Sequence, residues 1–166
     1  TNENSNETYL GLSENDFRTT PYKRYDGSQV DNMQANQERF SLKNYLEFKN
    51  GINLSSSMYL NKFHRNWYKL QSVVHDNNKI GISSLFNENN EEALYVIKGN
   101  VNSLEDALIV RANNRTYISK GLQLVLNKAF IRKNTTHDLS ISSRVHYDEM
   151  DRFQWEDKYE MFDRTM

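Results

Sequence analysis

The stretch from Arg111 to Asn134 reads RANNRTYISKGLQLVLNKAFIRKN and decides the fold expected for the second half of the chain. Within it, the segment GLQLVLNKAF repeats apolar residues at steps of three and four, which is the spacing of one face of an α-helix. These residues are Leu122, Val125, Leu126, Ala129 and Phe130. The preceding RTYIS is a short β-branched and aromatic run that is typical of a strand. We therefore expect a short strand followed by an amphipathic helix.

Four more segments favour helices. The clearest is SSSMYLNKFHRNWYKLQSVVHD, where the apolar residues Tyr59, Phe63, Trp67, Leu70 and Val74 again recur at steps of three and four. SLKNYLEFKNG has the same character and ends at a glycine placed to terminate a helix. NSLEDALIVRANN begins with a serine suited to capping, followed by two acids. The acidic tail DEMDRFQWEDKYEMFDRTM fits a helix and, less well, a strand.

Two further segments predict strands. ALYVIK is a short apolar run that ends at Gly99-Asn100, and DLSISSRVHY alternates apolar and polar residues along its length. The resulting order is helix, helix, strand, helix, strand, helix, strand, helix. This order predicts an α+β fold for residues 41–166, a small single domain with amphipathic helices packed on a short sheet.

Residues 1–40 differ from the rest because their apolar residues follow no sustained period. Such a segment gains order by burying its apolar side chains on a partner. We expect an extended N-terminal arm that binds a neighbouring subunit. Its anchors would be large apolar residues, namely Tyr9, Leu12, Phe17, Tyr22 and Tyr25.

The cationic residues form a block that the net charge of −1 conceals. The block contains Arg111, Arg115, Lys120, Lys128, Arg132 and Lys133 and no carboxylate, whereas residues 138–166 carry eight acids and four bases. One interpretation is that the block faces the acidic tail or arm, in the same subunit or its neighbour. The alternative is a basic patch that binds nucleic acid through phosphate contacts.

Little in the sequence points to catalysis. There is no cysteine, and the six glycines form no phosphate-binding loop. The cluster HYDEMD, from His146 to Asp151, combines an imidazole with carboxylates but lacks the spacing of a defined metal site. We expect no catalytic residue, no metal site and no cofactor, and hence a protein that is not an enzyme.

These features predict a non-enzymatic structural or assembly subunit of a larger protein particle, with a virion as the preferred setting. Its partners would be other protein subunits, in a homo- or hetero-oligomer. The alternative is a nucleic-acid-binding module that uses the basic block. No run approaches the roughly 18 apolar residues of a membrane-spanning helix, and the N-terminus lacks a signal-peptide pattern. We expect a soluble protein without membrane contact, located in the cytoplasm or within the assembled particle.

Overall fold

The computed structural model describes all residues from Thr1 to Met166 and consists mostly of antiparallel β-sheet. Strands account for 60% of the residues, and the two helices bring the helical share to only 13%. The expected α+β fold, with amphipathic helices on a short sheet, is therefore wrong. The chain is a β-rich protein in which long strands replace the expected helices.

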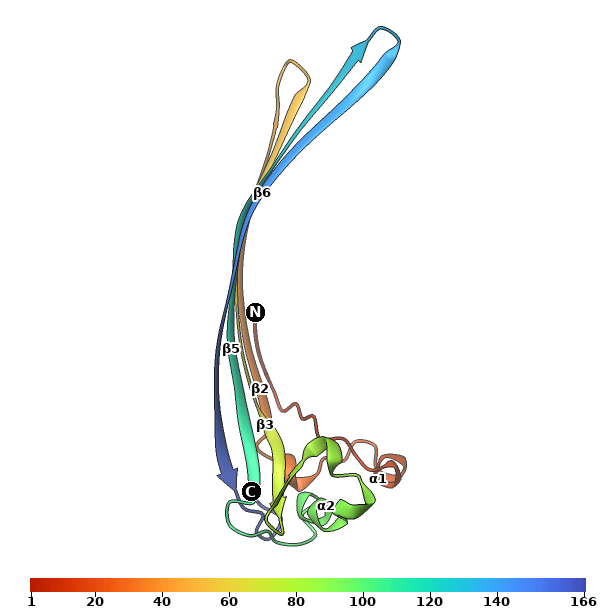
Figure 1. The fold of residues 1–166 in the computed structure, drawn as a ribbon, viewed down its shortest axis with the longest axis vertical. Helices are drawn as coiled ribbons and strands as arrows, with labels where there is room; N and C mark the ends of the chain where they lie inside the picture. Colours follow the sequence, from red (N-terminus) through yellow and green to blue (C-terminus); the bar gives the residue numbers. More distant parts are fainter. The chain divides into compact units, whose positions relative to one another are not determined.

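Figure 1 labels the principal elements of the fold. The strands are β1 (Asn2–Ser5), β2 (Asn32–Glu47), β3 (Ile52–His75), β4 (Asn78–Gly81), β5 (Leu108–Arg132) and β6 (Thr135–Tyr159). The helices are α1 (Glu14–Thr19) and α2 (Glu91–Ile97), and three short 3-10 turns occur at η1 (Asp26–Ser28), η2 (Ile82–Ser84) and η3 (Glu88–Asn90). In the sheet the order is β1-β2-β3-β5-β6, with β4 paired to β3.

The segments expected to be helices are strands. Their apolar spacing fits the strand period of two residues as well as the helix period of 3.6. In β3, the steps of four between Tyr59, Phe63 and Trp67 are also multiples of two, so the same residues share one face of a strand. Leu122, Leu126 and Phe130 in β5 behave in the same way. The tail also continues as strand up to Tyr159, within β6.

One segment that was expected to be a strand is a helix in the structure. ALYVIK lies largely within α2, whose buried residues Ala93, Val96 and Ile97 stand at helical spacing. Glu91 and Glu92 occupy the first turn, where carboxylates favour the positive end of the helix dipole. The segment around Ser103 is a loop that leads into β5, and not a helix. The strands predicted in RTYIS and DLSISSRVHY are confirmed as parts of β5 and β6.

Two tight turns set the registers of the hairpins. Asp76 and Asn77 join β3 to β4 with φ values of 48° and 62°, as a type I′ turn requires. Lys133 and Asn134 form a two-residue turn between β5 and β6. This turn places Arg132 opposite Thr135, so that Leu122 faces Val145 further along the hairpin.

The chain divides into two compact units. Unit 1 contains Thr1, residues 36–64 and residues 116–151, whereas unit 2 contains residues 2–35, 65–115 and 152–166. Unit 1 therefore consists of the turn-proximal parts of the β2–β3 and β5–β6 hairpins. Both helices and β4 belong to unit 2.

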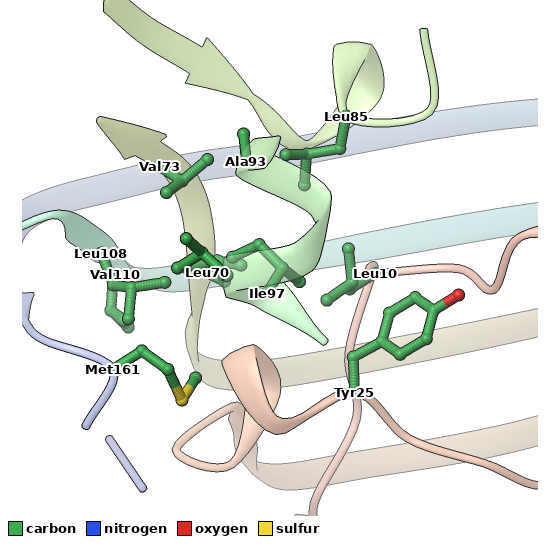
Figure 2. Close-up of a cluster of buried hydrophobic side chains, with 11 residues drawn as sticks. Leu10, Tyr25, Leu70, Val73, Leu85, Ala93, Ile97, Leu108, Val110 and Met161 are labelled. Atoms are coloured by element: carbon green, nitrogen blue, oxygen red, sulfur yellow. The ribbon is translucent and has the colours of Figure 1, made fainter. Parts of the chain in front are cut away.

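All buried hydrophobic residues lie in unit 2. Figure 2 shows Ile97 and Ala93 of α2 packed near Leu70 and Val73 of β3, with Leu108 and Val110 of β5 beside them. Leu10, Tyr25, Leu85, Val96 and Met161 complete the cluster. Burying each large aliphatic side chain contributes about 1.5–3 kcal/mol. This cluster is therefore the main source of hydrophobic stabilisation in unit 2.

The N-terminal segment contributes to this core. Leu10 is 8% exposed and Tyr25 is 2% exposed, both against residues of the same chain. Arg24 donates from Nη1 to the Asn6 carbonyl oxygen at 2.7 Å and from Nη2 to the Asp31 carbonyl oxygen at 3.1 Å. Residues 1–40 thus contain β1, α1, η1 and the first part of β2, and they fold partly onto their own chain.

Candidate interaction surface

One side of the unit 1 sheet presents apolar side chains from four adjacent strands. We call this side the apolar face. It comprises Phe40 and Leu42 of β2, Met58 and Leu60 of β3, Leu122 and Leu124 of β5, and Leu139, Ile141, Val145 and Tyr147 of β6. All of these side chains are exposed, and Val145 reaches 70%. The face arises because alternate residues of a strand point to the same side of the sheet.

A hollow of about 600 Å³ lies on the apolar face. Its lining includes Phe40, Leu60, Leu122, Val145 and Tyr147, which come from all four strands. Lys120 is the one charged residue of the lining, and its Nζ lies 4.9 Å from the centre of the Tyr147 ring. The hollow therefore suits an apolar partner surface and offers few hydrogen-bonding groups to a polar ligand.

Unit 1 contains no buried residue. A β-sheet is stabilised when one face is buried against another layer of protein, and the core of a domain lies between such layers. No helix or second sheet of unit 1 covers the apolar face, because both helices belong to unit 2. The apolar face is thus an exposed apolar surface of the kind that marks an interaction site.

The opposite side of the unit 1 sheet carries a polar row organised around Tyr59. Its ring lies over Gly121 of the neighbouring strand, where an added Cβ atom would be 2.5 Å from Tyr59 Oη. Tyr59 Oη is hydrogen-bonded to His146 Nδ1 and accepts a hydrogen bond from Arg144 Nη2 at 3.0 Å. His146 Nε2 lies 2.6 Å from Asp148 Oδ2.

This polar row was not identified from the sequence. Tyr59, Gly121 and His146 are distant in sequence and meet only because β5 lies between β3 and β6. A shallow hollow of about 350 Å³ beside the row is lined by Gln37, Arg39, Tyr59, Asn61, Ser119, Arg144 and His146. Alternation also divides the HYDEMD cluster, because Glu149 and Asp151 project from the face opposite to His146 and Asp148.

A second histidine cluster lies in unit 2. His75, Asp76 and Glu92 place one ligand atom each within 4.8 Å of the others, so the three could hold a metal ion. His75 Nε2 is 2.8 Å from Glu92 Oε2 and 3.8 Å from Asp76 Oδ2. Both carboxylates are highly exposed, and such contacts are equally those of a surface ion pair.

The structure separates the five expected arm anchors. Tyr25 is buried in unit 2 and is therefore inaccessible to a partner, and Leu12 packs partly against the same core. The Tyr9 ring lies 4.3 Å from the ring of Trp67, with Lys69 Nζ 3.2 Å from the Tyr9 ring centre. Tyr9, Phe17 and Tyr22 are all exposed, Tyr22 to 99%. These three side chains remain available to a neighbouring subunit.

The six cationic residues of the expected basic patch are divided between the two units. Arg111 and Arg115 belong to unit 2, whereas Lys120, Lys128, Arg132 and Lys133 belong to unit 1. Arg111 Nε donates to Glu156 Oε1 at 2.8 Å across the β5–β6 hairpin. This hydrogen bond holds the pKa of the Glu156 carboxyl below its usual range. For Arg111, the pairing agrees with a basic block that faces the acidic tail.

These observations define a β-rich protein in which unit 1 is a four-stranded amphipathic sheet with an uncovered apolar face. No protein-family model, curated protein or solved structure matches the chain. Neither of the two helices has the length and apolar character needed to cross a membrane.

Proposed function

We propose that the chain is a non-enzymatic structural module of a larger protein assembly, and that its apolar face binds a neighbouring protein subunit. The observation that carries this proposal is the absence of any buried residue in unit 1, although apolar side chains from four strands gather on one of its sides. A partner that covered the apolar face would supply the missing layer.

The magnitude of the effect supports a stable contact. Each large apolar side chain of the face contributes about 1.5–3 kcal/mol when it is fully buried. Part of this gain is lost to the entropy of association and to side-chain ordering. A cluster such as Phe40, Leu60, Leu122 and Val145 is nevertheless large enough to form the centre of a protein interface.

The proposal is tested by sedimentation velocity of the full chain at several concentrations. Leu122→Asn with Val145→Asn places two amides at facing positions on the apolar face. Gln123→Asn with Ser142→Asn is the matched control, because it changes the other face of the same two strands. We expect wild type and control to associate with increasing concentration, and the face variant to remain monomeric. Identical folded monomers for all three proteins would contradict the proposal.

A second candidate is contact between the apolar face and lipid acyl chains. From Leu139 to Tyr147, the apolar residues of β6 extend over about 27 Å at the usual rise of a strand. Such a sheet would lie along the membrane surface, because the hydrocarbon core cannot satisfy the backbone groups of an open strand edge. Flotation with phosphatidylcholine vesicles separates the candidates. If wild type and the control bind the vesicles and the face variant does not, the apolar face contacts lipid.

A further inference from the structure

The outer edge of β6 is a long strand edge without a neighbour. β6 is the last strand in the sheet order and pairs only with β5. It is 25 residues long, and every side chain from Thr135 to Gln154 is exposed. Unpaired N–H and C=O groups along such an edge form a template for another strand. Native proteins protect long edges with proline, charged side chains or a covering segment, and of these β6 has charged side chains but no proline, since the single proline of this chain is Pro21.

The register shows which backbone groups of β6 are available. In an antiparallel pair, successive residues direct their backbone groups alternately toward and away from the neighbouring strand. The two-residue turn makes the odd-numbered residues of β6 face β5, and the Val145 carbonyl oxygen indeed lies against Gly121 of β5. The even-numbered residues, such as Ser140 and Ser142, therefore direct their N–H and C=O groups to the free edge.

The charges along this edge restrict the partner. Between Asp138 and Asp151, β6 carries four carboxylates and one cationic residue, Arg144. Arg144 already donates to Tyr59 within the sheet. In a parallel, in-register pair with a second copy of β6, each carboxylate would face its own counterpart, and like charges directly opposite destabilise a strand pair. A strand that carries lysine or arginine complements the edge.

We infer that the free edge of β6 in unit 1 pairs with an extended, basic and amphipathic strand of a neighbouring protein subunit. The apolar residues of this strand would continue the apolar face, and its cationic residues would lie beside Asp138 and Asp148 on the polar side. Main-chain hydrogen bonds would supply affinity, and the alternating side chains would supply specificity. The inference rests on the proposed function, because it specifies how the neighbouring subunit joins unit 1.

The test uses the full chain and a fluorescent ten-residue peptide that alternates valine and lysine. Fluorescence anisotropy measures its affinity for wild type, Ser142→Pro and Ser142→Thr. The proline removes an outward N–H while leaving the contacts with β5 in place, and the threonine keeps that N–H. We expect Ser142→Pro to weaken binding at least tenfold and Ser142→Thr to bind as wild type does. Equal affinities for all three proteins would overturn the inference.

A double variant covers the case in which Ser142→Pro does not fold. Asp138→Lys with Asp148→Lys reverses the charge of the edge and leaves its backbone groups unchanged. We expect this protein to lose the valine–lysine peptide and to bind a valine–glutamate peptide instead. Unchanged preference for the lysine peptide would overturn the inference.

The two proposals can fail separately. If Ser142→Pro loses the peptide but the Leu122→Asn and Val145→Asn variant still associates as wild type does, the edge inference stands and the proposed role of the apolar face fails. If the face variant becomes monomeric and the peptide binds every edge variant equally, the proposed function stands and the edge inference fails.

Discussion

At the scale of single residues, the pair Tyr59 and Gly121 shows how the unit 1 sheet packs without a core. Glycine has no side chain, so the Tyr59 ring lies directly on the backbone of β5 and its hydroxyl reaches His146 on β6. This arrangement links three strands through one side chain. The sequence contains all three residues, but only the strand order brings them together.

Gly121→Ala is expected to destabilise the chain. Its Cβ atom would lie 2.5 Å from Tyr59 Oη and 2.8 Å from the Val145 carbonyl oxygen, so the Tyr59 side chain and the backbone of β6 must both move. Overpacking of this kind typically costs about 1–3 kcal/mol. Urea denaturation measures the change, with Gly81→Ala as the control because no atom lies within 4 Å of its added Cβ. Equal denaturation midpoints for the two variants would refute this view of Gly121.

Two aspartates of unit 2 predict opposite dependences of stability on pH. The Lys98 ammonium, 2.8 Å away, and the Tyr25 hydroxyl lower the pKa of Asp16. Asp16 therefore stabilises the folded state above its ordinary pKa of about 4, and this contribution disappears as the pH falls. Burial raises the pKa of Asp31 despite the hydrogen bond from Leu70 N. Its contribution is complete below the ordinary pKa and is lost as the pH rises through the raised value.

Asp16→Asn and Asp31→Asn test these signs when the free energy of unfolding is measured between pH 3 and pH 7. The difference between wild type and Asp16→Asn should shrink toward low pH. The stability of wild type relative to Asp31→Asn should increase toward low pH. Parallel pH profiles for wild type and both variants would show that neither carboxyl changes its pKa on folding.

At the scale of elements, strand alternation and helical spacing compete within the same segments. DLSISSRVHY was recognised as a strand because polar and apolar residues alternate without interruption. In β3 and β5, apolar residues four apart fit both periods, so the expected helices are strands in the structure. Local sequence cannot resolve such cases, because residues four apart share a face in helix and strand alike. In ALYVIK, a helix formed because its apolar residues pack into the unit 2 core.

The division of the basic block along β5 makes a prediction about nucleic acid. If six cations bound phosphates together, the logarithm of affinity would fall with that of salt concentration at a slope of about −5. Alternation along β5 and the Arg111–Glu156 pair predict a much shallower slope. Fluorescence anisotropy with a 20-base-pair duplex at increasing salt measures it, and Arg115→Glu with Lys128→Glu should have little effect. A steep slope that this variant abolishes would restore the nucleic-acid interpretation.

At the scale of the whole molecule, burial is unequal between the two units. Unit 2 contains the hydrophobic cluster around Leu70, Val73, Leu108 and Val110, whereas unit 1 contains no buried residue. Exposed backbone hydrogen bonds and few apolar contacts are features of regions that open readily. We therefore expect unit 1 to open more readily than unit 2 in the isolated chain.

Hydrogen exchange should reveal this difference residue by residue. We expect the amides of Leu70, Val73 and Val110 to exchange slowly, and the outward amides of Ser140 and Ser142 to exchange rapidly. Addition of the valine–lysine peptide should slow exchange at the even-numbered positions of β6. Slow exchange at Ser140 and Ser142 in the isolated chain would show that their N–H groups are already protected.

The sequence by itself determined the composition of the surfaces: the alternation in DLSISSRVHY, the cationic block, and the lack of cysteine and of a phosphate-binding glycine loop. It did not determine which period the segments of β2, β3 and β5 would adopt. Tertiary structure decided this, because a strand is stabilised by hydrogen bonds and side-chain pairs with neighbours distant in sequence. The same long-range pairing assembled the apolar face from four strands, placed Tyr59 on Gly121, and left the outer edge of β6 unpaired.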